Sequence, residues 1–341
     1  MAAAKPALGA VRSPILVTGG AGYIGSHIVR VLADRGQDVV VVDNLGAGHR
    51  AALGDVPLIE ADFADAAMLD AELSDGKVEF IVHMAAFCEV GESMEEPAAY
   101  YANNLAGSLR LLDAARRHGV RGIVFSSTAA TYGEPRENPI TETHAQRPTN
   151  PYGETKLAFE RALAWHRQAG GPSYVALRYF NAAGAHPDGC IGEDHRPESH
   201  IVPRLLRGVL EDARQTVPIF GSDWPTPDGT CVRDYVHVLD LAQAHVLALD
   251  AMRSGDVVAD AFNLGNGEGF SVRQVVDSVG RVTGRPPQTR DAPRRSGDPA
   301  TLVASSAKSR ERLGWEPDFP DLDGIVSTAW QWHRTHPEGY G

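Results

Sequence analysis

The stretch "PILVTGGAGYIG" (residues 14–25) determines the fold that this sequence predicts. Its first half is a short apolar run that ends in glycines, which is typical of a buried strand. Its second half places Gly19, Gly22 and Gly25 between that strand and a helical pattern over residues 23–35. Glycines at such a junction allow a tight turn and let the backbone approach a pyrophosphate, which then faces the positive end of the helix. The pattern alone fits any tight turn, but its place near the N-terminus between strand and helix favours dinucleotide binding.

Strand-like and helix-like segments alternate through the first half of the chain. Strands are expected at residues 14–20, 38–44, 56–63, 80–86, 122–127 and 174–180, and the longest helices between them at Ala98–His118 and Tyr152–Ala169. This alternation predicts an α/β fold with a doubly wound parallel sheet, covered by helices on both faces.

The character of the sequence changes after Asn181. Residues 182–200 and 221–234 are rich in Gly, Pro, Asp and His. Loops of this length in a compact domain usually have a function. Helical patterns follow at 201–210, 271–284 and 324–334. We therefore expect a smaller, mixed α/β second lobe that lies over the carboxyl ends of the sheet strands.

Two acidic residues suggest which dinucleotide is bound. Asp43 ends the second predicted strand, 18 residues after Gly25. There a carboxylate would accept hydrogen bonds from an adenosine ribose and repel a 2′-phosphate, so NAD is favoured over NADP. Asp62 follows the third predicted strand, where it either bonds the adenine or is an ordinary turn aspartate.

Composition excludes several classes of function. The 341-residue chain has a net charge of −12 and no cluster of basic residues, which argues against nucleic-acid or anionic-membrane partners. Its three cysteines are widely spaced without a C-x-x-C pair, so neither a disulfide framework nor a cysteine zinc site is expected. The absence of a long apolar run or a signal-like segment predicts a cytoplasmic protein with a flexible tail over residues 1–13.

A candidate acid/base pair lies in "NPYGETK" (residues 150–156). Asn150 is a good helix N-cap and Pro151 a good first helical residue, so Tyr152 and Lys156 should lie one turn apart on one face. The pair alone is also compatible with a solvated lysine beside a half-buried tyrosine.

The hydroxyl groups of "VFSSTAATYG" (residues 124–133) favour the chemical interpretation. They place Thr128 at the carboxyl end of a predicted strand, where open α/β sheets bind ligands. A tyrosine is a poor base at neutral pH, but a nearby ammonium and a positively charged nicotinamide would stabilise its phenolate.

These motifs together resemble the extended short-chain dehydrogenase/reductases. More closely, "VGESMEEPAAYYANN", "RYFNAAGAHPDG", "DGTCVRDYVHV" and "APRRSGD" are similar to sequences of the UDP-glucose 4-epimerase family. The resemblance extends from about residue 14 to the C-terminal "HPEGY" and includes the second lobe.

The resemblance implies a Rossmann-type NAD-binding domain of residues 14–184 and 235–264, and a UDP-sugar-binding lobe of residues 185–234 and 265–341. It implies interconversion of UDP-galactose and UDP-glucose by C4 epimerisation, through a transient 4-keto sugar and with tightly bound NAD.

The alternatives are another nucleotide-sugar epimerase, for example one acting on UDP-N-acetylglucosamine, and a nucleotide-sugar dehydratase. In the dehydratases an Asp/Glu pair follows the strand-end threonine, where this chain has Ala129 and Ala130. A catalytically silent NAD-sensing protein would not need the set formed by Thr128, Tyr152 and Lys156.

The resemblance also implies roles for individual residues. Tyr152 is the base, Lys156 orients the nicotinamide ribose and lowers the pKa of the tyrosine, and Thr128 is the hydroxyl partner. The implied cofactor-binding residues are Gly19, Gly22, Tyr23, Ile24, Gly25, Asp43, Asn44, Asp62 and Asn104, with Tyr152 and Lys156. The implied substrate-binding residues are Thr128, Asn181, His200, Phe220, Arg233, Arg295, Asp298 and Leu302.

The resemblance implies a specific role for four of these substrate-binding residues. Arg233 and Arg295 resemble the diphosphate ligands, although each could instead form a surface ion pair with a neighbouring aspartate. Asp298 resembles the residue that binds the uridine ribose. Phe220 resembles part of the uracil pocket, although an isolated phenylalanine is more often a core residue.

Two positions differ from the commonest family pattern: Cys88 stands where some relatives have lysine, and His200 where several have asparagine. His200 could join His195 and Cys190 in a metal cluster, but their spacing is irregular and a redox-neutral NAD mechanism needs no metal. No metal is therefore expected. A homodimer is expected, built on the two long helices as in relatives.

Overall fold

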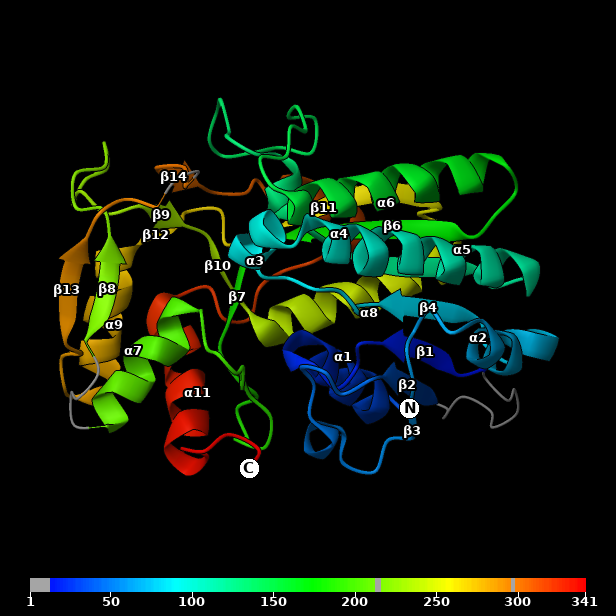
Figure 1. Ribbon diagram of the computed structural model, residues 1–341, viewed down its shortest axis with the longest axis horizontal. Coiled ribbons are helices and arrows are strands. Elements are labelled where there is room, and N and C mark those ends of the chain that lie inside the picture. The colour runs from blue at the N-terminus through cyan, green and yellow to red at the C-terminus, as the bar shows by residue number, and fades with distance from the viewer. Residues whose placement is uncertain (1–12, 212–215, 296–297) are drawn as a thin grey trace, which may run out of the picture.

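A seven-stranded parallel sheet forms the centre of the computed structural model, which describes residues 13–211, 216–295 and 298–341 (Figure 1). The strand order is β11-β6-β5-β4-β1-β2-β3. The strands are β1 (Ile15–Thr18), β2 (Val39–Asp43), β3 (Leu58–Glu60), β4 (Phe80–His83), β5 (Gly122–Thr128), β6 (Ser173–Tyr179) and β11 (Ala259–Leu264). The chain reverses its direction of winding between β1 and β4, and in such sheets ligands bind at this switch point, beyond the carboxyl ends of the strands.

Helices cover both faces of this sheet. The helices are α1 (Tyr23–Asp34), α2 (Ala66–Leu73), α3 (Val90–Glu95), α4 (Pro97–Tyr100), α5 (Ser108–Arg117), α6 (Pro151–Gln168), α7 (Ile201–Leu210), α8 (Val238–Ser254), α9 (Val272–Thr283), α10 (Ala307–Leu313) and α11 (Leu322–Thr335), with short turns η1 (Arg50–Leu53), η2 (Ser74–Gly76), η3 (Tyr101–Gly107) and η4 (Ala129–Thr131). Successive strand side chains point to opposite faces. Ile15 and Val17 therefore pack with α1 and α8, whereas Leu16 packs with α2, α5 and α6.

The predicted fold class is confirmed, and the positions of the expected strands are close to those observed. The third strand is shorter than the expected 56–63, because only Leu58–Glu60 pair with β2. The expected single helix Ala98–His118 is wrong in detail: α4 is followed by the π-helical segment η3 and then by α5. Such π segments are frequent at functional sites, and η3 includes Asn104, one of the expected cofactor ligands. Helix α8 and strand β11 were not among the expected elements.

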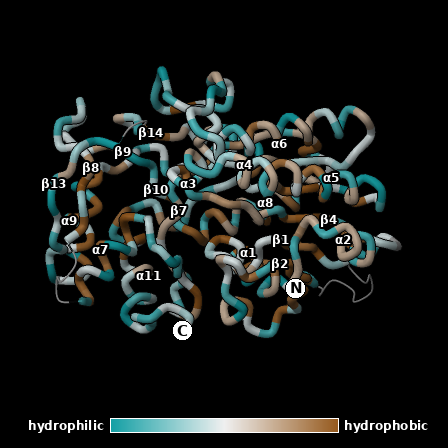
Figure 2. Tube along the Cα trace, in the orientation of Figure 1, coloured by the Kyte–Doolittle hydropathy of each residue, from teal (hydrophilic) through white to brown (hydrophobic). Residues whose placement is uncertain are grey.

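The second lobe has a core of its own. Side chains of α7, α9 and α11 pack together around Val217 of β8 (Val217–Phe220) and Tyr235 of β10 (Tyr235–His237). Short strands complete the lobe: β8 pairs with β13 (Thr289–Ala292), and β9 (Val232–Arg233) pairs with β12 (Phe270–Ser271) and β14 (Thr301–Leu302). Strands β7 (Asn181–Ala183) and β10, from segments expected in the first domain, pair with each other next to this core. Hydrophobic stretches lie inside both lobes, and the outer loops are mostly hydrophilic (Figure 2).

The expected division into two domains remains a prediction, and α10 refines it. This helix lies in a segment assigned to the second lobe, but it packs against α8 and β11 of the first lobe. Just after it, Trp315 is fully buried in the sheet core and its indole donates to the carbonyl of Asp240, 2.8 Å away. All of the expected tail except residue 13 lies outside the described residues. In the described part of the chain, no helix is both long and apolar enough to span a bilayer.

Candidate active site

The glycine-rich turn between β1 and α1 is built for close approach to the backbone. A Cβ on Gly19, whose φ is +69°, would lie 2.5 Å from the backbone nitrogen of Ala85, and one on Gly25 would lie 2.2 Å from the carbonyl oxygen of Gly19. Gly22 is different, because its nearest neighbour would be 3.5 Å away. It is the N-cap residue of α1, and no side chain caps this helix. The first turn of α1 therefore presents uncapped backbone N–H groups, which suits a pyrophosphate.

Asp43 is held beside this turn. One of its carboxylate oxygens accepts from the backbone N–H of Ala21 at 2.9 Å, and the other from that of Leu45 at 2.8 Å. Asn44 similarly accepts from Gly46 at 3.0 Å. The carboxylate that would meet the adenosine ribose is thus fixed to the phosphate turn itself. Both oxygens keep a free lone pair for hydroxyl donors.

The other expected cofactor residues differ in what they contact. Asp62 is exposed after β3 and accepts from Ala64 at 2.8 Å, which is the geometry of a turn aspartate with its carboxylate still open to solvent. The hydroxyl of Tyr23 donates to the carbonyl of Gly184 at 2.6 Å, so this side chain ties α1 to the residue that follows β7. Ile24 packs against the sheet core.

Asn104 is buried, and its amide is fully engaged within the protein. It bonds both the N–H and the carbonyl of Phe87, accepts from Asn103 and donates to Thr155. These partners use all four of its hydrogen-bonding positions. Asn104 therefore fixes the loop that carries Cys88, which borders the site.

Helix α6 positions the candidate acid/base pair. It begins as the sequence predicts: Asn150 accepts from the N–H of Gly153 at 2.8 Å and Pro151 is the first helical residue. Lys156 is 3% exposed and donates to the carbonyl of Ser126 on β5 at 2.8 Å. Its ammonium also lies 5.9 Å from the centre of the Tyr152 ring. The helix and the strand end thus hold the lysine and the tyrosine together.

The electrostatics of the pair follow from burial. Desolvation raises the pKa of Tyr152, the nearby thiol of Cys88 would raise it further if ionised, and the hydrogen bond with Thr128 lowers it. Burial lowers the pKa of Lys156 to about 8. Burial therefore favours the protonated phenol. A cationic ring beside Tyr152 would act in the opposite direction and favour the phenolate.

A buried ion pair connects α6 to the sheet next to the candidate acid/base pair. Glu160 of α6 and Arg178 of β6 are each 7% exposed, with a closest nitrogen–oxygen distance of 2.5 Å. Ser127 donates to the same carboxylate, and the guanidinium also donates to the hydroxyl of Tyr132 at 2.9 Å. Since Ser127 precedes Thr128, this network links the strand end to the helix that carries the catalytic pair.

The second lobe presents a separate cationic group. Arg233 of β9 is nearly buried, with its side chain 11% exposed, and one of its terminal nitrogens has no hydrogen-bond partner among the described residues. Arg295 is 60% exposed, lies 3.0 Å from Asp298, and stacks over the ring of Phe220 at 4.8 Å. Asp298 also lies 3.7 Å from Arg233 and so bridges the two guanidinium groups. Leu302 pairs in register with Arg233 on the adjacent strand.

Two other expected substrate residues lie between the lobes. Asn181 begins β7, beside β10, and its backbone N–H donates to the carbonyl of Asp234. His200 precedes α7, but its ring nitrogen faces Glu193 at 2.8 Å. Glu193 and Glu198 were not among the expected site residues, although the "GEDH" and "PESH" motifs place a carboxylate two residues before each histidine.

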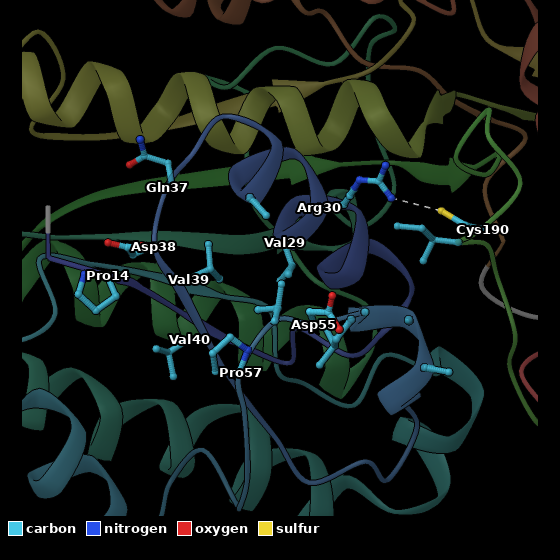
Figure 3. Close-up of a pocket in the computed structure, with 17 residues that line it drawn as sticks. Pro14, Val29, Arg30, Gln37, Asp38, Val39, Val40, Asp55, Pro57 and Cys190 are labelled. Atoms are coloured by element: carbon cyan, nitrogen blue, oxygen red, sulfur yellow. Dashed lines mark hydrogen bonds between the residues drawn. The ribbon is translucent and has the colours of Figure 1, made fainter. Parts of the chain in front are cut away.

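A pocket of about 820 Å³ lies elsewhere, at the amino ends of β1 and β2 (Figure 3). Pro14, Val29 and Val39 line it, with Asp55 and Cys190 at other parts of its wall. Ligands of open α/β sheets bind at the carboxyl ends instead, where Gly19, Thr128 and Tyr152 lie. This pocket is therefore not the cofactor site.

Known proteins resemble the chain over nearly its full length. A model of the NAD dependent epimerase/dehydratase family matches residues 15–265. The UDP-glucose 4-epimerase of Halalkalibacterium halodurans is 53% identical over 96% of this chain and 97% of its own. The crystal structure of UDP-glucose 4-epimerase from Brucella ovis in complex with NAD is 46% identical, with a TM-score of 0.90 over 94% of this chain and 98% of that one. The corresponding structure from Bifidobacterium longum, in complex with NAD⁺ and UDP, is 36% identical, with a TM-score of 0.89 over 96% and 100%.

Proposed function

The chain belongs to the NAD dependent epimerase/dehydratase family, and from this premise we infer that its site epimerises C4 of a UDP-hexose. The chain interconverts UDP-galactose and UDP-glucose with NAD as its cofactor. The geometric observation that supports this function best is the group formed by Thr128, Tyr152 and Lys156. It lies at the carboxyl end of β5, on the sheet edge from which the glycine-rich turn also emerges.

Bound NAD⁺ supplies an acceptor for the C4 hydride and, once reduced, returns it. In our proposal the phenolate of Tyr152 removes the proton of the C4 hydroxyl, and Thr128 shares this proton through its own hydroxyl. The ammonium of Lys156 stabilises the phenolate and binds the nicotinamide ribose. The resulting 4-keto sugar turns over while its UDP stays bound, receives hydride on the opposite face, and takes back the proton from Tyr152.

This cycle requires firm binding of the nucleotide and loose binding of the sugar. The terminal nitrogen of Arg233 that makes no hydrogen bond to any described residue, and lies 3.7 Å from Asp298, supports a role in the first requirement, because a buried cationic donor without a hydrogen bond is costly unless a ligand satisfies it. We propose that Arg233 and Arg295 bind the diphosphate, that Asp298 binds the uridine ribose, and that Phe220 lines the uracil pocket. The stacking of Arg295 on Phe220 fits adjacent diphosphate and base sites.

The substitution Arg233→Ala should weaken UDP binding by about 2–4 kcal/mol, or roughly 30- to 800-fold in Kd, because a desolvated charge-assisted contact is lost. Arg295→Ala should have a smaller effect, since that side chain is largely exposed. Titration calorimetry with UDP measures both effects. The control is Arg281→Ala on α9, whose exposed pair with Asp323 lies outside the arginine group. An unchanged affinity in Arg233→Ala would assign this arginine to structure alone.

Substrate range should depend on Leu302. We propose that it bounds the C2 side of the sugar, where an acetamido group needs extra space. Its pairing with Arg233 in register supports a place next to the diphosphate. We expect good activity on UDP-galactose and UDP-glucose, and slower turnover of UDP-N-acetylglucosamine.

Leu302→Ser should raise kcat/KM for UDP-N-acetylglucosamine relative to UDP-galactose by about ten- to hundredfold, and Leu302→Tyr should lower the ratio, since one pocket side chain discriminates by about 1–3 kcal/mol. Thr301→Ser is the matched control, because neighbouring strand residues point to opposite faces. Equal ratios in all three variants would remove Leu302 from the sugar pocket.

The chain lacks the proton-transfer pair that a dehydratase has at the end of this strand, which argues against the dehydratase alternative. Ala129 and Ala130 follow Thr128 and form η4, and neither side chain can transfer a proton. Incubation with UDP-galactose, without added NAD, tests the proposal directly. We expect UDP-glucose to form from cofactor that the protein already holds. A 4-keto-6-deoxy product would identify a dehydratase, and no product from NAD-loaded protein would contradict both.

We further propose that the chain forms a homodimer in the cytoplasm. Helices α5 and α6 lie side by side (Figure 1), and large apolar side chains on this face and nearby are exposed: Met94 (61%), Tyr101 (42%), Leu109 (36%) and Trp165 (68%). Two such faces together would form a four-helix isologous interface. Sedimentation should give twice the 36.5 kDa mass of one chain. A monomer at micromolar concentration would contradict the dimer, and Trp165→Glu should convert the dimer to monomers.

A further inference from the structure

A second group of chemically reactive side chains lies in the segment before α7, apart from the catalytic pair. It consists of two carboxylates and two imidazoles, from Glu193, His195, Glu198 and His200. Each residue offers one ligand atom, and these four atoms all lie within 4.8 Å of one another. We refer to these four residues as the His/Glu cluster. The proposed epimerisation uses none of them as acid or base.

Within the part of the chain that the structure describes, the facing atoms of the His/Glu cluster have no hydrogen-bond partners. Oε1 of Glu193, Nδ1 of His195, Oε2 of Glu198 and Nδ1 of His200 are each shielded from solvent, and each lacks a partner with hydrogen-bond geometry. Glu193 is only 4% exposed. Nδ1 of His200 lies at an ion-pair distance of 2.8 Å from Oε1 of Glu193, but the angles of a hydrogen bond between them are not met. Buried polar atoms left in this state are costly unless something else satisfies them.

The spacing of these atoms matches a small cation in their midst. Oε1 of Glu193 lies 3.2 Å from Nδ1 of His195 and 2.8 Å from Nδ1 of His200. Glu198 lies 3.8 Å from His195 through Oε2 and 3.3 Å from His200 through Oε1. Four ligands at the usual zinc distances of 2.0–2.1 Å in a tetrahedron are separated from one another by about 3.3 Å. The observed separations lie on both sides of this value.

We propose that the His/Glu cluster binds one divalent transition-metal ion of the zinc class. Two neutral imidazoles and two carboxylates form a neutral complex with a divalent cation. Mixed nitrogen and oxygen ligands favour zinc and its neighbours over magnesium or calcium, which prefer oxygen alone. No metal was expected at His195, His200 and Cys190, because their spacing is irregular and a redox-neutral NAD mechanism needs no metal. The structure instead joins these histidines to Glu193 and Glu198.

The position of the cluster indicates a structural metal. The carbonyl of Glu193 accepts from the indole of Trp332 on α11, and His200 is the N-cap residue of α7. The ring of His195 meets that of Tyr23, in the first turn of α1, at 6.2 Å. A bound ion would therefore fix the start of α7 and the adjoining loop against the phosphate turn. All four ligands come from the protein, which leaves no open position for substrate and is typical of structural sites.

A neighbouring group provides a contrast within the same loop. His186, Asp188 and Cys190 also lie close together, but Asp188 and Cys190 are exposed and both contact Arg30. No atom of this group is among the described buried polar atoms that lack a partner. It therefore gives a matched control for metal binding by a loop histidine.

The experiment uses the full chain with its NAD, stripped of metal by a chelator and then titrated with Zn²⁺ in competition with a chromogenic chelator. We expect one Zn²⁺ per chain. His195→Gln and Glu193→Gln should each lower the affinity of the chain for Zn²⁺ by at least about hundredfold. Loss of a residue that only hydrogen-bonds to a metal ligand already lowers metal affinity by about 10- to 100-fold. His186→Gln should bind Zn²⁺ like the unaltered chain. NAD content checks that each variant is folded.

A second measurement does not depend on any variant. Co²⁺ added to the stripped, unaltered chain should give the intense visible absorption of a tetrahedral site, and an equimolar amount of Zn²⁺ should abolish it. A weak octahedral spectrum, or Zn²⁺ affinity equal in the unaltered chain and in a folded His195→Gln variant, would overturn the proposal. If His195→Gln does not fold, the same comparison is made with His200→Gln, because the side chain of His200 is more exposed.

Discussion

Replacing Tyr152 with phenylalanine should lower kcat for UDP-galactose by at least about 10²-fold, the lower range for loss of a general base. The change removes only the hydroxyl that Thr128 contacts, from a ring whose centre lies 5.9 Å from the ammonium of Lys156. The ring keeps its packing on α6, so NAD should remain bound and the fold intact. Initial rates of UDP-glucose formation, together with NAD content per chain, measure both effects.

The control for this variant is Tyr174→Phe, which removes a phenolic hydroxyl from the same sheet. Tyr174 lies near the amino end of β6, opposite to the end at which Thr128 closes β5. Its kcat should stay within about twofold of the unaltered chain. Near-normal activity in Tyr152→Phe would show that Tyr152 is not the base and that its pairing with Lys156 on one helix face is structural.

Glu160→Gln should lower the free energy of unfolding by about 3–5 kcal/mol, because it leaves the charge of Arg178 buried and unpaired. Both side chains are 7% exposed, and the guanidinium meets the carboxylate through two of its nitrogens. Burial lowers the pKa of Arg178, whereas the Glu160 carboxylate and the Tyr132 hydroxyl raise it. In Glu160→Gln the guanidinium still keeps its charge, because arginine is not deprotonated in proteins. Urea unfolding of the NAD-loaded protein, at one fixed NAD concentration, measures the change.

The matched control breaks an exposed ion pair. Asp34→Asn removes the partner of Arg30 on α1, where the two side chains are 59% and 38% exposed. Exposed pairs one helical turn apart contribute about 0.3–0.5 kcal/mol. A loss below about 1 kcal/mol in Glu160→Gln would mean that Tyr132 and solvent already balance the arginine charge.

Much of the molecule was predictable because its signals are local. A strand that ends in Gly19 and leads directly into a helix reports a phosphate turn, since the required backbone geometry is formed by consecutive residues. Asn150 and Pro151 likewise place the start of α6, and with it Tyr152 and Lys156, within a single turn of helix. The alternation of strands and helices was enough to predict the parallel sheet. Each element could be recognised from the sequence because the direction of its side chains repeats with a fixed period.

The helix expected at Ala98–His118 shows where local signals end. Its composition is helical throughout, yet η3 takes the wider π geometry. Asn104, in that segment, bonds Phe87 and Thr155 from two distant parts of the chain. No local propensity describes such a compromise, because those partners are brought to it only by packing.

Tertiary structure alone decided the properties that depend on long-range proximity. Glu160 and Arg178 are 18 residues apart and become partners only when α6 lies on β6. Burial, which comes from the whole fold, lowers the pKa of Lys156 to about 8 and shields a nitrogen of Arg233 that makes no hydrogen bond to any described residue. The His/Glu cluster is close in sequence, but its four facing atoms converge because α7, α11 and the first turn of α1 fix the loop between them. Desolvation and convergence are properties of three-dimensional packing, and a linear pattern contains neither.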